Sequence, residues 1–244
     1  MPLTLDIARR ELMSFYRSPI AYVMAAAFAL LTCYFFFLAF EPGQPVSGVW
    51  QHTFGRLVQV MVFLLPALSM RLIAEEFRSG TIETLMTAPV TDTQVVVGKW
   101  LGAMGLYTTM LALPLAAIAL VAFSHVTRDP GGGQFLAGAA GLLMVGGVFM
   151  AIGLFASAMT QNQIVAWILA VVMLSVVTFV TEYLYAARWL SNEIREVVGY
   201  VDMTQQAGAF ARGLIQPAGI AYFVTAAGLF LFCAIKAVES RRWR

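Results

Sequence analysis

The sequence has few charged residues, few cysteines and few histidines, and these shortages exclude several classes of protein. Only 11% of the 244 residues are charged, whereas soluble domains carry about 25%. The formal net charge of +2 and the high apolar content exclude a nucleic-acid binder and a disordered chain. Cys33 and Cys233 lie inside apolar runs and lack the spacing of a disulfide framework or a metal site.

Motifs for catalysis are missing as well. Gly98-Lys99 resembles the end of a phosphate loop, but Thr93 replaces the first glycine and Trp100 replaces the residue that holds magnesium. His52 and His125 fall in predicted loops, so paired intramembrane haem ligation is excluded. The sequence contains no HExxH motif, no GxSxG motif and no Cys/His cluster. We therefore expect a protein that is not an enzyme and holds no metal or cofactor.

Apolar residues are abundant, at 60% of the chain with a mean hydropathy of +0.80. A helix needs about 20 apolar residues to cross a bilayer. Six segments qualify, at about 20–40, 57–74, 94–123, 135–159, 164–187 and 218–238. The expected fold is an all-α integral membrane protein with six transmembrane helices, forming one domain over residues 20–244. The third segment is long and contains Pro114, which favours a tilt or a kink.

The distribution of basic residues predicts the orientation. With six spans, both termini share a side with the connections at 75–93 and 160–163, and ten Lys and Arg residues fall on this side, including Lys99. The other side has five. Since cytoplasmic segments carry the excess of Lys and Arg, we expect both termini in the cytoplasm.

Residues 1–19 form an amphipathic stretch ahead of the first span. Apolar residues recur at helical spacing on one face, at Leu5, Ala8, Leu12 and Phe15. Arg9, Arg10 and Arg17 are the basic residues of this stretch, and Pro19 marks a bend into the span. One interpretation is an interfacial helix whose arginines lie near anionic membrane lipid. The other is a connecting helix that also contacts a cytoplasmic partner.

Three further features leave alternatives open. Residues 188–217 are too long for a plain turn and suit an outer, re-entrant-like segment. Glu182 is a candidate for ion or proton handling, or an interfacial carboxylate with a polar neighbour. Gly98-x-x-x-Gly102 and the glycines of the fourth span favour close helix packing within the chain, with a dimer seam as the alternative.

The connection at 75–93 is the most distinctive loop. It begins with Glu75, Glu76 and Arg78, and Gly80 allows a sharp break after the second span. Residues 81–88 can form a short helix that ends before Pro89. Because so short a helix is marginal alone, we expect it to dock against a partner rather than to be a solvated loop.

Residues 71–90, with the sequence RLIAEEFRSGTIETLMTAPV, closely resemble the first cytoplasmic loop of ABC-2-type transporter permeases. The N-terminal segment 8–22 and the region of Lys99 also fit this family. Residues 210–215 look like the matching segment of its gliding-motility branch, and the permease of nitrous-oxide-reductase maturation is more distantly similar.

The resemblance implies a permease subunit whose loop after the second span is a coupling helix, seated on a separate ABC ATPase subunit. It implies polar contacts from Glu75, Glu76 and Arg78, a helix start shaped by Gly80 and Thr81, and groove contacts from Ile82 and Leu85. ATP and Mg would be bound by the ATPase. A second permease copy or paralogue would complete the complex in the bacterial inner membrane, with an accessory envelope subunit as a further partner.

Two alternatives to an exporting permease remain at this point. The first is a non-transporting membrane scaffold that passes ATPase-driven force to envelope partners. The second is an ion- or proton-driven carrier built around Glu182, although the spans contain few of the polar residues that such a carrier needs. The sequence does not specify a substrate.

Overall fold

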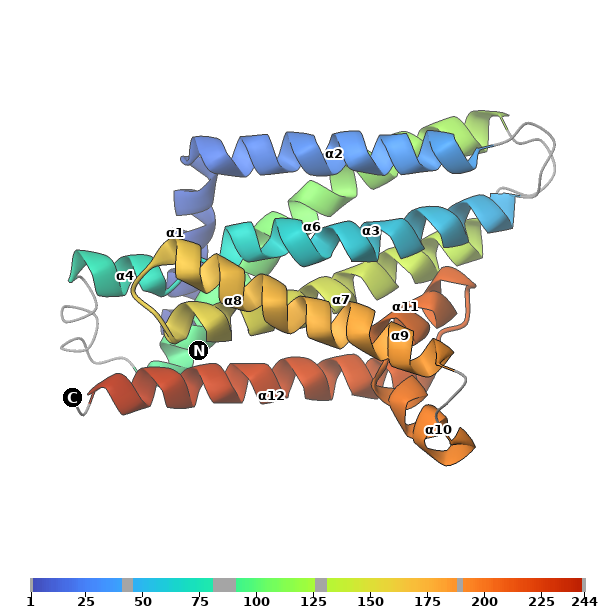
Figure 1. Ribbon diagram of the computed structural model, residues 1–244. Coiled ribbons are helices and arrows are strands. Elements are labelled where there is room, and N and C mark those ends of the chain that lie inside the picture. The colour runs from blue at the N-terminus through green and yellow to red at the C-terminus, as the bar shows by residue number, and fades with distance from the viewer. Residues whose placement is uncertain (1, 41–45, 81–90, 126–130, 188–190, 243–244) are drawn as a thin grey trace.

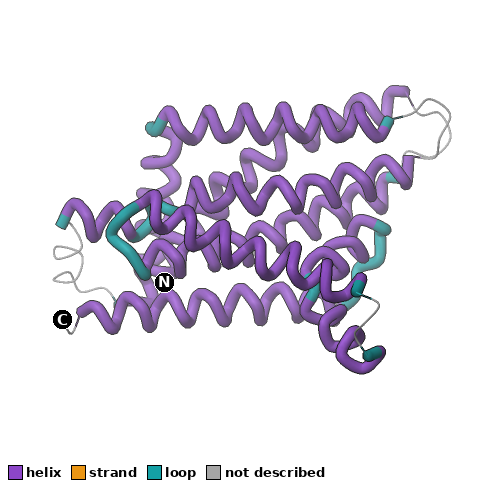
Figure 2. The backbone as a smooth tube through the Cα atoms, in the orientation of Figure 1, coloured by secondary structure: helices purple, strands orange, loops and turns teal. Residues whose placement is uncertain are grey.

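The computed structural model describes residues 2–40, 46–80, 91–125, 131–187 and 191–242. Within these ranges every regular element is a helix, as the composition predicts. The long helices lie side by side in one bundle (Figures 1 and 2), and both termini lie toward the same end of it, here called the terminal end. The opposite end is called the distal end.

The helices that build the bundle have the following bounds: α1 Pro2–Tyr16, α2 Pro19–Ala39, α3 Val46–Ser69, α4 Ala74–Ser79, α6 Asp92–His125, α7 Gly132–Ala158, α8 Gln163–Ser175, the π-helix η1 Val176–Val180, α9 Thr181–Ala186, α10 Asn192–Val201, α11 Met203–Ala211 and α12 Pro217–Arg242. Six segments of this set are long and apolar enough to cross a membrane. α6 is the longest and runs obliquely across its neighbours (Figure 1). Its 34 residues span about 51 Å, more than a hydrocarbon core of about 30 Å, which accounts for the tilt.

The outer surface of the bundle is apolar. Leu30 on α2, Ile164 on α8 and Val224 on α12 are 72%, 68% and 62% exposed. A water-soluble monomer rarely exposes apolar surface on this scale, but a bilayer solvates it. The chain is therefore a multi-pass membrane protein.

α7 lies at the centre of the bundle and is glycine-rich because large side chains from other helices fill the space beside it. A Cβ on Gly138 would meet the ring of Phe54 from α3 at 2.2 Å, and one on Gly146 would meet Tyr107 from α6 at 2.1 Å. Gly141 has the same relation to Phe210 of α11, at 2.6 Å. The prediction of close helix packing within the chain is confirmed for these glycines.

The second span differs from its predicted range of 57–74. α3 begins at Val46, ends at Ser69 and is followed by a turn at 70–73. Gln51, His52 and Arg56 interrupt the apolar run in the first half of α3, so hydropathy alone missed it. On its other face Trp50 and Phe54 are buried, and their packing stabilises the helix there. The other five spans begin within three residues of their predicted starts.

α1 packs across the terminal end of the bundle, roughly perpendicular to α2 (Figure 1). Its buried face keeps most of the predicted one, since Phe15 is buried and Ala8 and Leu12 are half-buried, but it excludes Leu5. Leu5 is 63% exposed, whereas Ile7 and Phe15 are buried. The prediction for Leu5 is wrong because α1 packs on α6 rather than only on lipid, and this contact selects the face centred on Ile7 and Glu11.

Candidate functional site

α1 packs on α6 at a pair of glycines, Gly98 and Gly102. A Cβ on Gly98 would lie 2.8 Å from the Ile7 side chain, and one on Gly102 would lie 2.8 Å from the backbone oxygen of Ala8. Neither glycine tolerates a larger side chain without displacing α1. The Gly98-x-x-x-Gly102 spacing thus serves contact within the chain.

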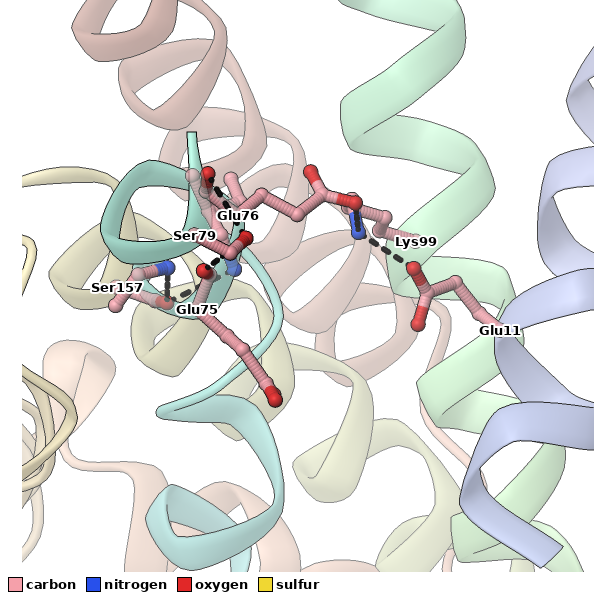
Figure 3. A network of polar contacts seen from close by, with 8 residues as sticks. Glu11, Glu75, Glu76, Ser79, Lys99 and Ser157 are labelled. Atoms are coloured by element: carbon pink, nitrogen blue, oxygen red, sulfur yellow. Dashed lines mark hydrogen bonds and ion pairs between the residues drawn. The ribbon is translucent and has the colours of Figure 1, made fainter. Parts of the chain in front are cut away.

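Lys99 lies between these glycines and is the electrostatic centre of the terminal end (Figure 3). Its ammonium is 2.5 Å from a carboxylate oxygen of Glu11 on α1 and 2.7 Å from one of Glu76 on α4. The Lys99 side chain is only 1% exposed, and the carboxylate side chains are 15% and 17% exposed. Because all three groups are largely removed from water, their mutual attraction is strong and each is costly to leave unpaired.

The group has a net charge of −1, since two carboxylates share one ammonium. Oε2 of Glu76 is buried and has no hydrogen-bond partner among the described residues. The Lys99 ammonium therefore links three helices. A displacement of α4 would change the distance between Glu76 and Lys99 and so act on α6 and, through Glu11, on α1.

α4 is also held by α7. The Ser157 hydroxyl (Figure 3) accepts hydrogen bonds from the backbone N–H groups of Ile73 and Ala74, at 3.1 and 2.9 Å. It also donates one to the carbonyl of Met70, at 2.9 Å. The first turn of a helix has N–H groups without intrahelical partners. Ser157 thus caps α4 from a different helix, because the residue that precedes α4, Ile73, has no capping side chain.

Two arginines complete the attachment of α4. Arg71, in the turn before it, donates to the Ser18 hydroxyl at 2.9 Å and lies over the ring of Phe15. Arg241 of α12 lies over the ring of Phe77 at 4.7 Å. These contacts leave α4 joined to α1, α6, α7 and α12.

Of the residues predicted to contact an ATPase, some are exposed on α4 and one is ion-paired within the chain. Glu75 and Arg78 are exposed on α4, whereas Glu76 is engaged by Lys99. Gly80 adopts φ of +71° and ends α4, so the predicted break after the second span is confirmed. The remaining predicted coupling residues, Thr81, Ile82 and Leu85, lie outside the described residues. The arginines predicted for the connecting helix, Arg9, Arg10 and Arg17, are all exposed.

Sequence reasoning missed the central residues of this site. From the sequence, Lys99 is considered as the end of a phosphate loop, as a cytoplasmic basic residue and as part of the family resemblance, but not as the partner of a carboxylate, and no role is assigned to Glu11 or Ser157. A usable signal existed for Lys99, since a lysine flanked by Gly98 and Gly102 at the start of an apolar helix needs a counter-charge from a helix packed on those glycines.

The distal end contains a second set of polar groups. Asp202 is fully buried at the junction of α10 and α11, and its Oδ1 accepts a hydrogen bond from the Thr204 N–H. Burial raises the pKa of this carboxyl above its usual value of 3.8, and hydrogen bonds from the backbone of Thr204 and Gln205 oppose the rise. This carboxylate caps α11 at its junction with α10.

Glu182 is half-buried on α9 beside a distal cavity of about 390 Å³ that also involves Arg56. No ion pair joins Glu182 to any residue in the described part of the chain. Nor do the described ranges contain a group of three His, Cys, Asp or Glu side chains placed to hold a metal ion.

Comparison with known proteins identifies a family for this chain. Residues 5–188 match the profile described as ABC-2 family transporter protein, which covers more than half of the chain. No curated protein matches the sequence significantly. The chain belongs to the ABC-2 family of transporter proteins and is a membrane-spanning permease component of an ABC transporter.

Proposed function

We propose that this permease couples ATP hydrolysis by a separate ABC ATPase subunit to a conformational change of the helix bundle, and that α4 with the segment after it is the contact point. The observation that carries the proposal is the double ion pair of Lys99, which joins α4 to α1 and α6. Glu75 and Arg78 are exposed on α4 and available to a partner. ATP and Mg would be bound by that partner.

Force applied to α4 would travel by three routes. The Glu76–Lys99 pair leads to α6, and through Glu11 to α1. The Ser157 cap leads to α7 at the centre of the bundle, and the Arg241–Phe77 contact leads to α12. Because a packed core passes rigid displacements rather than deforming continuously, the expected motion is shear or rocking between two arrangements.

The finer features of the proposal follow from the resemblance in the coupling loop. They comprise a location in the bacterial inner membrane with both termini cytoplasmic, a second permease copy or paralogue in the complex, and export as the direction of transport. Similarity at 210–215 favours the gliding-motility branch. A reporter fused after Arg244 should register as cytoplasmic, and a periplasmic signal would overturn this orientation.

The experiment that tests the ATPase contact uses a photo-crosslinking amino acid at Arg78 in native membranes. We expect a crosslinked soluble subunit that carries phosphate-loop and signature motifs, identified by mass spectrometry. The matched control places the same amino acid at Glu196, which is also exposed but lies on α10 at the distal end. An ATPase adduct at neither position, or equally at both, would refute the proposed contact.

A second arm tests transmission rather than contact. Glu75→Ala removes an exposed α4 carboxylate, whereas Lys99→Met removes the internal link. In the crosslinked or co-purified complex, Lys99→Met should leave the ATPase bound but reduce the coupling between its hydrolysis and the permease. The opposite result would be that Lys99→Met loses ATPase binding while the complexes that still form keep normal coupling. Lys99 would then be needed for docking of the ATPase rather than for transmission.

A further inference from the structure

Three arginines converge on one concave site beside α1 at the terminal end. The cavity has a volume of about 470 Å³. Its polar lining comes from α1, from the α1–α2 connection, from the turn before α4 and from α4 itself, and consists of Arg10, Ser14, Arg17, Ser18, Arg71 and Glu75. Two regions that are distant in sequence, residues 10–18 and 71–75, therefore contribute to one site.

The three arginines and the one carboxylate of the lining leave this site with a net charge of +2, and none of the arginines forms an ion pair among the described residues. The guanidinium groups of Arg10 and Arg17 make no hydrogen bond or ion pair with the described part of the chain. The partners of Arg71 among the described residues are neutral: the Ser18 hydroxyl at 2.9 Å and the ring of Phe15. Glu75 is the acidic residue of the lining, and no ion pair joins it to any of the three arginines.

Positive charges that share a concave surface repel one another and raise the local concentration of anions. Arginine is suited to a phosphate in particular, because its planar group can donate two parallel hydrogen bonds to two phosphate oxygens. The Ser14 hydroxyl supplies a further donor at the same cavity. We propose that this cavity, here called the arginine pocket, binds the phosphate of an anionic phospholipid head group.

The apolar surroundings favour a lipid over a soluble phosphate. Met13 lines the pocket and is 47% exposed. Ile20 and Tyr22, at the start of the first span, are 48% and 62% exposed. A head group in the pocket would thus have its acyl chains against an apolar helix, and its phosphate at the level where a membrane helix begins.

A bound phosphate would bridge α1 and the turn that precedes α4. If the proposed ATPase coupling is correct, an anionic lipid would then stiffen the link between these elements, and that consequence alone rests on the proposed function. The binding itself is independent of any ATPase and can be measured on the isolated full-length chain.

The test is native mass spectrometry of the detergent-solubilised full-length protein, titrated with phosphatidylglycerol and, separately, with phosphatidylcholine. Arg10→Gln and Arg17→Gln each remove one guanidinium from the pocket. Arg9→Gln is the matched control, since Arg9 is exposed on the same helix but does not line the pocket. Inorganic phosphate is titrated in a further arm to distinguish a soluble ligand from a lipid.

We expect phosphatidylglycerol to bind more tightly than phosphatidylcholine. Each pocket substitution should weaken its binding about fivefold, which corresponds to ~1 kcal/mol per interfacial arginine. The double variant should lose about 25-fold on the same basis, and Arg9→Gln should change little. Arg17→Lys should restore only part of the loss, because it keeps the charge without the planar fork.

Three results would overturn the proposal. Equal losses in Arg9→Gln and the pocket variants would mean diffuse attraction along α1 rather than a site. Equal affinity for the two lipids, together with no binding of inorganic phosphate, would mean that the pocket selects no anion. Binding of inorganic phosphate without binding of phosphatidylglycerol, lost in the same variants, would keep the phosphate site and reject the lipid as its source.

Discussion

Lys99→Met is the sharpest test of the terminal end. Methionine keeps an unbranched apolar side chain in the space of the lysine stem but removes the ammonium that Glu11 and Glu76 share. The two carboxylates are then left close together, largely buried and uncompensated. Removing one partner of a buried ion pair costs about 3–5 kcal/mol.

This free energy translates into a large change in thermal unfolding. For chains of this size, 1 kcal/mol shifts the midpoint by about 2–4 °C, so Lys99→Met should lower it by roughly 6–20 °C. The assay is thermal unfolding of the detergent-solubilised protein at a fixed scan rate, because unfolding of such proteins is often irreversible.

The chain contains a matched control for this substitution. Lys236 and Glu239 on α12 form a pair with the same N···O distance of 2.7 Å as Lys99 and Glu76, but their side chains are 58% and 43% exposed. Exposed pairs contribute about 0–1 kcal/mol, so Lys236→Met should shift the midpoint by less than about 4 °C.

A compensating variant separates charge from packing. Combining Lys99→Met with Glu11→Gln and Glu76→Gln removes the stranded charges and should recover most of the lost stability, since neutral replacement of a buried ionic group is often tolerated. Similar shifts for Lys99→Met and Lys236→Met, or a triple variant no more stable than the single one, would refute the electrostatic reasoning.

Three further substitutions test individual contacts. Gly102→Val should displace α1 and lower the unfolding midpoint, because even a Cβ would meet α1 backbone at 2.8 Å, whereas Gly228→Val, with open space around it, should not; equal midpoints would contradict the packing. Ser157→Ala should cost about 1–2 kcal/mol and speed hydrogen exchange at the start of α4, and unchanged exchange there would show that the cap is unimportant. Asp202→Asn should remove a pH dependence of the free energy of unfolding. Because burial raises the pKa of Asp202 in the folded state, the wild-type free energy of unfolding should fall as the pH rises from 3.8 through that raised value. An identical slope in the variant would disprove the assignment.

The transmembrane helices could be predicted because their signal is local. A run of apolar residues long enough for the bilayer needs no knowledge of its neighbours, so five spans begin within three residues of their predicted starts. The break at Gly80 was equally local, since a positive φ is easy for glycine. The family resemblance also rests on a contiguous stretch, residues 71–90.

The site depends on contacts that no local pattern specifies. Lys99 and Glu11 are 88 positions apart, and Ser157 caps a helix that begins 83 positions before it. The first half of α3 was missed because its buried face depends on aromatic packing with other helices. The sequence by itself thus determined six membrane helices, an amphipathic start and a charged loop, whereas only the tertiary structure decided which helix α1 packs on, which carboxylates share Lys99 and which arginines form a pocket. The physical reason is that hydropathy acts along the chain, while ion pairs and caps depend on which helices pack together.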